Sequence, residues 1–170
     1  MKKTFALIAL FLIPVSLFFS SDFSSKGLER CPFCQEEVIQ RQLFYQGKEI
    51  LGIATHKPAA TGHVLIIPLR HVERFEELSP SEVAEMGQVI QKIDRAVRHL
   101  HGTTGYLLIQ KNGQEAGQSV PHVHFHYIPV TKGDSQIWLA LKFFLSPWFS
   151  ARTAEEMKPQ IVALSNEMEL

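Results

Sequence analysis

Three histidines that alternate with apolar residues constrain this chain more than any other feature of it. The stretch is His122-Val123-His124-Phe125-His126-Tyr127-Ile128. Strict alternation is typical of a β-strand, in which successive side chains point to opposite faces of a sheet. The three imidazoles therefore share one face, and the residues between them face a core. Each buried ring needs partners for its nitrogens, so the row is a poor choice for packing alone and favours a reactive site.

The composition is that of one globular domain with extensions. The chain has 170 residues, of which 45% are hydrophobic, which supports a proper core and argues against disorder. The 17 basic and 17 acidic side chains cancel. No overall field attracts nucleic acid, and we predict no nucleic-acid partner.

Residues 1–25 have the order of a targeting segment. Lys2 and Lys3 precede an almost unbroken apolar run over 5–19, and small polar residues follow. This order predicts a secretory signal peptide, with an uncleaved membrane anchor as the second interpretation. We therefore expect the protein to be exported or membrane-anchored, with a membrane contact through this segment. The alternative is a buried amino-terminal helix of a cytoplasmic protein.

The only two cysteines, Cys31 and Cys34, form a Cys-x-x-Cys pair. Two thiolates at this spacing hold one zinc ion if histidines elsewhere complete a tetrahedron. They equally form a redox-active or structural disulfide, which export would favour. The third interpretation is two partly buried thiols without a ligand.

The strand pattern predicts a mostly antiparallel arrangement. The expected strands run over residues 43–45, 50–54, 63–68, 106–110 and 122–128. A tight turn at 46–48 joins the first two. The polar loop at 111–117 joins the last two as a hairpin, which places this loop beside the imidazoles.

One long helix is expected between the third and fourth strands. Ser79 and Glu82 form a capping box at its start, and Gly102 ends it. The apolar stripe expected to face the core is Val83, Met86, Val89 or Ile90, Ile93 and Val97.

Residues 133–170 form a carboxy-terminal helical extension. An apolar run at 137–145 is followed by Thr153 and Glu156, which are placed to cap a last helix. We expect the extension to pack on its own domain. The alternatives are that it covers a dimer groove, closes over the site or touches a membrane.

Several of these segments resemble the histidine triad (HIT) family of nucleotide-binding hydrolases and transferases. Besides the histidine row, residues 62–73 resemble the family's first core strand and exit loop, and residues 112–120 its phosphate-side loop. Cys31-Pro32-Phe33-Cys34 resembles the zinc-binding start of the bacterial branch. The resemblance covers about residues 31–130, and we place the HIT domain at 26–132. It implies an α+β fold, with a five-stranded antiparallel sheet crossed by one long helix, and a homodimer.

The resemblance also implies a reaction at a nucleotide substrate. His124 would attack the α-phosphorus and form a covalent nucleotidyl-histidine, which water then hydrolyses. A neutral imidazole is a good nucleophile near neutral pH. His126 would donate to a phosphate oxygen or to the leaving group, and His122 would orient the neighbouring ring. No metal is required for this chemistry.

Substrate-binding groups are expected beside the imidazoles. The hydroxyl of Ser119 and the backbone of the Gly117-Gln118 turn would stabilise phosphate charge, with the side chains of Asn112 and Gln118 on the same side. At the position expected for the family's ribose-binding aspartate, the chain has Thr55. A threonine hydroxyl cannot accept hydrogen bonds from both ribose hydroxyls as a carboxylate does.

The resemblance implies a structural zinc site as well, made from Cys31, Cys34, His71 and His122. Two rival functions remain open. In the first, His122 and His124 chelate a metal ion directly. In the second, the chain is a non-catalytic protein of the same fold that binds a nucleotide or a metal. A purely structural domain would leave the same-face imidazoles unexplained.

Overall fold

The computed structural model describes residues 31–169. The predicted signal peptide or anchor at 1–25 lies outside the described residues. Among those that are described, no helix is both long enough and apolar enough to cross a bilayer.

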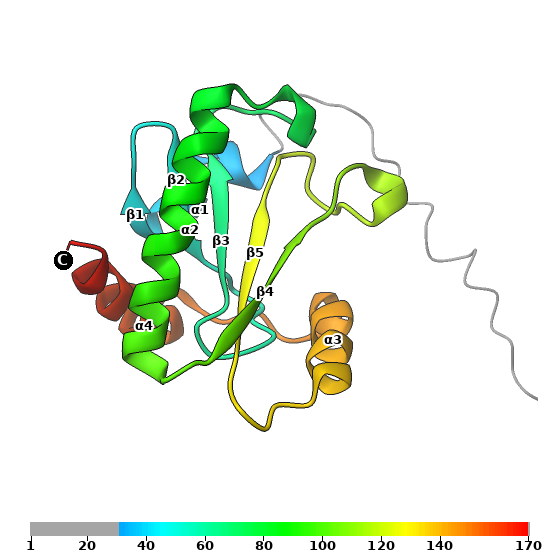
Figure 1. Cartoon of the computed structure of the whole chain (residues 1–170). Helices are drawn as coiled ribbons and strands as arrows, with labels where there is room; N and C mark the ends of the chain where they lie inside the picture. The colour runs from blue at the N-terminus through cyan, green and yellow to red at the C-terminus, as the bar shows by residue number, and fades with distance from the viewer. Residues whose placement is uncertain (1–30, 170) are drawn as a thin grey trace, which may run out of the picture.

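A five-stranded antiparallel sheet forms the centre of the structure (Figure 1). Its strands are β1 (Leu43–Gln46), β2 (Ile50–Ala54), β3 (Val64–Pro68), β4 (Gly105–Gln110) and β5 (Phe125–Val130). Their order across the sheet is β1-β2-β3-β5-β4, and every neighbouring pair is antiparallel. The predicted fold class is confirmed, and both predicted hairpins, β1–β2 and β4–β5, are present.

The long helix α2 (Pro80–His101) begins at the predicted capping box of Ser79 and Glu82 and ends at Gly102, which has a φ of 63°. Ala96, which is outside the predicted stripe, is buried, whereas Val83, which was expected to face the core, is exposed. The reason is the neighbouring Glu82, which takes the inward position. Its carboxylate is satisfied there by Arg70, at 2.7 Å, and by the backbone N–H of Ser79.

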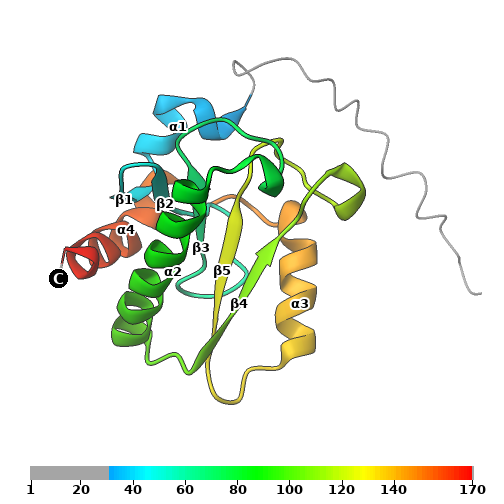
Figure 2. The same ribbon diagram turned by 45° about the horizontal axis from the view of Figure 1, so that its top comes forward.

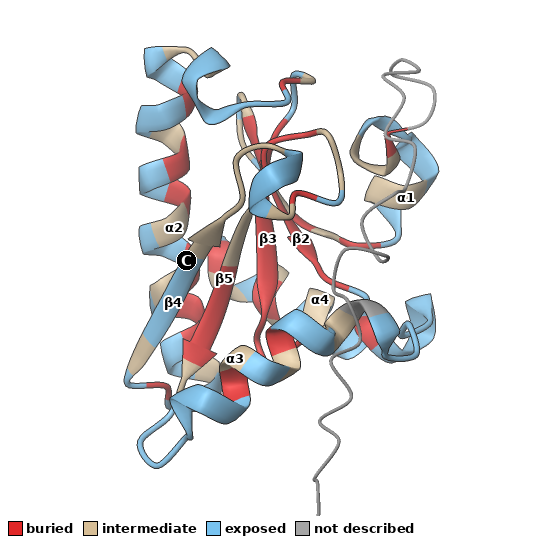
Figure 3. Ribbon diagram, turned by 90° about the vertical axis from the view of Figure 1, so that its right-hand side faces the viewer, coloured by how far each residue is buried: buried red, intermediate tan, exposed pale blue. Residues whose placement is uncertain are grey.

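Helices lie on both sides of the sheet (Figure 2), and alternate residues of its strands pack against one layer or the other. On one face, Val64 and Ile66 pack with α2 and with the end of α4 (Ala154–Met168). On the other, Leu65 and Ile67 pack against the segment of the short helix α1 (Glu36–Gln40). Farther along this second face, α3 (Gln136–Leu145) packs on Ile128. The central strands are therefore buried from both sides (Figure 3).

The histidine segment reaches the sheet later than the alternation predicts. The strand β5 begins at Phe125, so His122 and His124 precede it. The backbone N–H of Val123 donates to the carbonyl of Val72, 2.7 Å away, rather than to a strand of the sheet. The alternation of faces still holds, because Val123 and Tyr127 are fully buried on the side opposite to the imidazoles.

The capped last helix is confirmed, with a capping box of Thr153 and Glu156 at the start of α4. This helix contacts α2 and β1, and Leu164 is part of the main core. We expect Leu164→Ala to lower the free energy of unfolding by about 2–5 kcal/mol, because it opens a cavity between α4 and the sheet. Urea unfolding measures this change.

Val162→Ala on the same helix is the matched control, since Val162 is half exposed. It should change the stability by less than about 0.5 kcal/mol. Equal effects of the two substitutions would mean that α4 is not docked as described.

Candidate active site

The three predicted histidines lie together on the face of the sheet that α1 and α3 cover. His122 and His124 are buried, and the rings of His124 and His126 meet edge to face with their centroids 5.1 Å apart. A fourth imidazole, that of His63, lies 5.2 Å from His126 by the same measure. The site therefore contains a continuous row of rings.

A single hydrogen bond determines which nitrogen of His124 carries the proton. Its Nδ1 lies 2.7 Å from the backbone carbonyl of His122. A carbonyl oxygen only accepts, so Nδ1 is protonated and donates. In the neutral ring, Nε2 is then left with a free lone pair. This is the state that a histidine nucleophile needs.

A second chain of bonds sets the opposite tautomer on His126. The backbone N–H of Ala59 donates to Nδ1 of His63 at 2.9 Å, so Nε2 of a neutral His63 carries the proton. This Nε2 lies 3.0 Å from Nδ1 of His126 and donates to it. Nε2 of His126 is consequently protonated and serves as a hydrogen-bond donor.

Sequence reasoning missed His63. The signal was present, because His63 lies two residues before Leu65, at a position that shares the histidine face. Its partner, however, lies 63 residues away in the chain, and only the pairing of β3 with β5 brings the two rings together.

Burial keeps these rings neutral. It lowers the pKa of His63 to about 3 and that of His126 to about 2. It also lowers the pKa of His124, despite the bond to the carbonyl of His122. Removing an imidazolium from water is costly, so the unprotonated forms dominate at neutral pH. The tautomers derived above are therefore those of the working pH.

Two aromatic rings and one cation surround the row. Phe33 contacts His124 edge to face at 5.4 Å, and Phe143 of α3 contacts His126 at 4.8 Å. The ammonium of Lys111 lies 5.0 Å from the centre of the Phe143 ring. Its positive charge is near enough to help lower the pKa of both His124 and His126. Lys111 was not among the predicted site residues.

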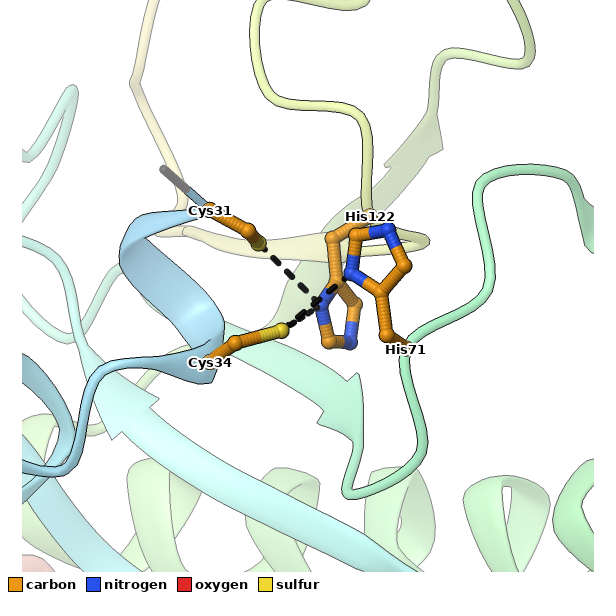
Figure 4. Close-up of side chains that lie close together, drawn as sticks. All are labelled: Cys31, Cys34, His71 and His122. Carbon is orange, nitrogen blue, oxygen red and sulfur yellow. Dashed lines mark hydrogen bonds between the residues drawn. The ribbon is translucent and has the colours of Figure 1, made fainter. Parts of the chain in front are cut away.

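The four predicted metal ligands come together beside the row (Figure 4). Their donor atoms all lie within 4.8 Å of one another, and both cysteines are free thiols. Sγ–Nδ1 distances are 3.5 Å from Cys31 to His122, 3.6 Å from Cys34 to His122 and 3.2 Å from Cys34 to His71. A tetrahedral zinc ion separates a sulfur ligand from a nitrogen ligand by roughly 3.5 Å. The donor set fits such an ion.

The far side of the His122 ring supports this fit. Its Nε2 lies 3.0 Å from the carbonyl of Pro68, so Nε2 carries the proton and Nδ1 presents its lone pair to the two sulfurs. An outer hydrogen bond of this kind orients a metal-binding histidine. These four residues can therefore hold a metal ion.

The two predicted amide side chains of the polar loop are bonded to the protein itself. Asn112 accepts from the backbone N–H of Phe75 and donates to Glu76, both at 2.8 Å. Gln118 accepts from the backbone N–H of Gly113 at 2.7 Å and donates to the carbonyl of Glu73 at 2.9 Å. Both amides fix the course of the loop. Their role in substrate binding stays a prediction.

The other predicted substrate-binding residues have different settings. Ser119 is exposed. Gly117 ends a short turn in the left-handed region, with a φ of 79°, which favours glycine. Thr55 is buried just after β2, and its hydroxyl accepts from the backbone N–H of Lys57 at 3.3 Å. Their contacts with a substrate also stay predictions.

An α+β domain with three alternating histidines on one face of its sheet is the arrangement expected of a histidine triad protein. The comparison with protein families agrees, because the family model described as "HIT domain" matches residues 36–133, more than half of the chain. The chain therefore belongs to the HIT family.

Two curated relatives and one solved structure show how far the similarity extends. A HIT-like protein of Methanocaldococcus jannaschii is 34% identical over 109 residues, which are 63% of this chain and 84% of the relative. The bis(5'-nucleosyl)-tetraphosphatase [asymmetrical] of Schizosaccharomyces pombe is 37% identical over 93 residues, 55% of this chain and 51% of the relative. The chain thus spans about half the length of this second relative.

The solved structure is a Zn-bound histidine triad family protein from Mycobacterium smegmatis. It matches with a TM-score of 0.64 and 27% identity, over 84% of this chain and 96% of that one.

The lowered pKa of His63 predicts a dependence of stability on pH. Between the ordinary value of 6.5 and about 3, the unfolded chain binds a proton that the folded chain does not. The free energy of unfolding therefore falls as the pH falls from 6.5 toward 3. In His63→Gln this contribution is lost, so the unfolding constant should rise less steeply as the pH falls. The difference from the unaltered protein should be up to about tenfold per pH unit.

Urea unfolding of both proteins between pH 7.5 and 4.5 checks this slope. The difference in stability between the two proteins at pH 7.5 measures the loss of the hydrogen bonds of His63. This loss is the same at every pH and is subtracted. Parallel curves would contradict a buried, neutral His63.

Proposed function

We propose that this protein is a hydrolase or transferase that acts on the α-phosphate of a nucleotide through a covalent nucleotidyl-histidine on His124. The observation that carries the proposal is the bond from Nδ1 of His124 to the carbonyl of His122. It leaves Nε2 unprotonated beside a protonated Nε2 on His126. A nucleophile and a hydrogen-bond donor thus stand next to each other in opposite tautomers.

In the first step, the Nε2 lone pair of His124 forms a bond to the α-phosphorus, and the bond from phosphorus to the leaving group breaks. The Nε2–H of His126 donates a hydrogen bond to the leaving atom, which takes up a proton from water as it departs, so His126 stays neutral. In the second step, water attacks the phosphorus and releases a proton to the solvent. The P–N bond breaks, and a nucleoside monophosphate leaves with His124 regenerated.

Two groups of donors support the phosphate in this proposal. Lys111 lies where its positive charge acts on both reacting rings and would stabilise the negative equatorial oxygens. The hydroxyl of Ser119 and the backbone at Gly117 and Gln118 remain the predicted donors on the loop side. The carbonyl of His122 stabilises the positive charge that His124 gains when it is nucleotidylated.

We propose nucleoside phosphoramidates or dinucleoside polyphosphates as the substrate class. The support is the name of the S. pombe relative, a bis(5'-nucleosyl)-tetraphosphatase. Because Thr55 stands where a carboxylate is expected, we expect the ribose to bind more weakly. The Thr55 hydroxyl already accepts a hydrogen bond from the backbone N–H of Lys57.

The rival in which His122 and His124 chelate one ion together has little geometric support. Nδ1 of His122 faces the sulfurs of Cys31 and Cys34, whereas Nδ1 of His124 is occupied by the carbonyl of His122. We propose instead that Cys31, Cys34, His71 and His122 hold a structural zinc ion, which would tie the segment before α1 to the histidine row.

We also propose a homodimer. The edge strand β4 leaves Tyr106, Leu107 and Leu108 partly exposed, each by about 40%. Apolar edges of this kind are normally covered in soluble proteins. A second copy paired along β4 would cover them.

The central prediction concerns His124. We expect His124→Gln to lower the rate of hydrolysis of an adenosine phosphoramidate or a diadenosine polyphosphate by roughly 10³-fold or more. Rapid mixing followed by a quench in neutral denaturant should show a nucleotidyl adduct by mass spectrometry in the unaltered protein and none in the variant. A neutral quench is needed because P–N bonds break in acid.

His101→Gln is the matched control, since this exposed histidine lies at the end of α2, and it should leave activity and adduct unchanged. Lys111→Met should give a partial loss. Tight nucleotide binding with no adduct and no turnover would instead favour the non-catalytic alternative.

The zinc proposal predicts about one zinc ion per chain in the purified protein, measured by elemental mass spectrometry. Cys34→Ser removes one of four ligands, so its zinc content and thermal midpoint should both fall. A protein with no zinc and a Cys31–Cys34 disulfide would contradict the proposal.

A further inference from the structure

The largest group of exposed apolar side chains on the described part of the chain lies on α3 and the short turn that follows it. We call this group the α3 surface, and its members are Ile137, Trp138, Leu141, Phe144, Leu145, Trp148 and Phe149. Ile137 is 83% exposed, Trp148 71% and Phe144 63%. Exposed patches of this kind mark interaction sites.

The opposite side of α3 is already used. Leu139 and Phe143 are buried against Ala59 and Ile128, and Phe143 covers His126. The helix is therefore apolar all round although only one side packs on the domain. A helix with this composition is normally buried on every side. The outer side requires a partner.

The charges around α3 indicate which partner. From residue 135 to residue 151 the only charged side chain is Lys142, and the segment is flanked by Lys132 and Arg152. Asp134 is the one acidic side chain among residues 132–152, in which Lys132, Lys142 and Arg152 leave a net charge of +2. Tryptophan and phenylalanine with basic neighbours are typical of elements that lie in the interface of an anionic bilayer.

The position of α3 agrees with the other membrane-directed feature of the chain. The described chain begins at Cys31, beside His122 and on the histidine face of the sheet. The α3 helix covers the same face. Cys31, the first described residue after the apolar run at 5–19, therefore lies on the same face of the sheet as α3.

We propose that the α3 surface docks on an anionic lipid bilayer. The helix has 10 residues, about 15 Å in length, so it lies in the plane of the interface rather than across it. Docking places the histidine row one helix diameter, about 10 Å, from the lipid. The proposed nucleotide chemistry would then take place at a membrane surface.

The chain supplies its own probe for this proposal. Its only two tryptophans, Trp138 and Trp148, both belong to the α3 surface. The full chain is mixed with vesicles of phosphatidylcholine and phosphatidylglycerol whose acyl chains carry bromine. We expect tryptophan emission to shift to shorter wavelength and about half of it to be quenched relative to unbrominated vesicles.

Two variants separate docking of α3 from anchoring by the amino-terminal segment. The double change Ile137→Glu and Phe144→Glu keeps that segment and both tryptophans, and it should abolish most of the quenching. Val162→Glu, at an exposed apolar position of α4, should not.

Three outcomes would overturn the proposal. The first is vesicle-bound protein with unquenched tryptophans. The second is equal quenching in the double variant. The third is a blue shift that grows with protein concentration without lipid, which would assign the surface to a second copy of the chain. None of these readouts depends on nucleotide turnover, so the proposal and the proposed function fail separately.

Discussion

The site depends on one residue, His122, whose ring and backbone serve two different groups. The Nδ1 of its ring faces the two thiols, and its Nε2 is held by the carbonyl of Pro68. Its own carbonyl accepts from Nδ1 of His124 and so sets the tautomer of the proposed nucleophile. A change in the cysteine–histidine cluster therefore reaches His124 through the carbonyl of His122, and also through Phe33, which lies between the two cysteines and contacts the His124 ring. A structural metal there would act on catalysis by positioning, without touching the substrate.

Burial and hydrogen bonding oppose each other in this row, and burial decides the charge. The carbonyl of His122 favours a protonated His124, yet the pKa of His124 is lowered, because the cost of desolvating an imidazolium is larger. The same cost explains how His63 and His126 share one proton across 3.0 Å without repulsion between two charged rings. A row of four histidines is tolerated in a core when the rings are neutral and hydrogen bonds at Nδ1 of His63, His124 and His126 hold their tautomers. That condition also fixes which nitrogens remain for chemistry.

Much of the fold could be predicted from the chain because its signals are local. The capping boxes at Ser79 and Thr153, the alternation before Tyr127 and the apolar strand ended by Pro68 each depend on a few neighbouring residues. The misses involve long-range contacts. Val83 was assigned to the core because the burial of Glu82 depends on Arg70, 12 residues earlier. His63 was not assigned to the site, because its partner His126 lies 63 residues away in the chain.

The extension after β5 shows why composition alone could not decide its role. The apolar run at 137–145 is compatible with packing, a lid and a membrane contact, and in the structure one side of this helix packs on the domain while the other is exposed. Phe143 closes the outer end of the histidine row while Phe144, the next residue, points to solvent. Lys111 lies over both rings, 5.0 Å and 5.6 Å from their centres. Whatever covers the outer side of α3 is thus linked, through two adjacent phenylalanines, to the cation beside the reacting histidines.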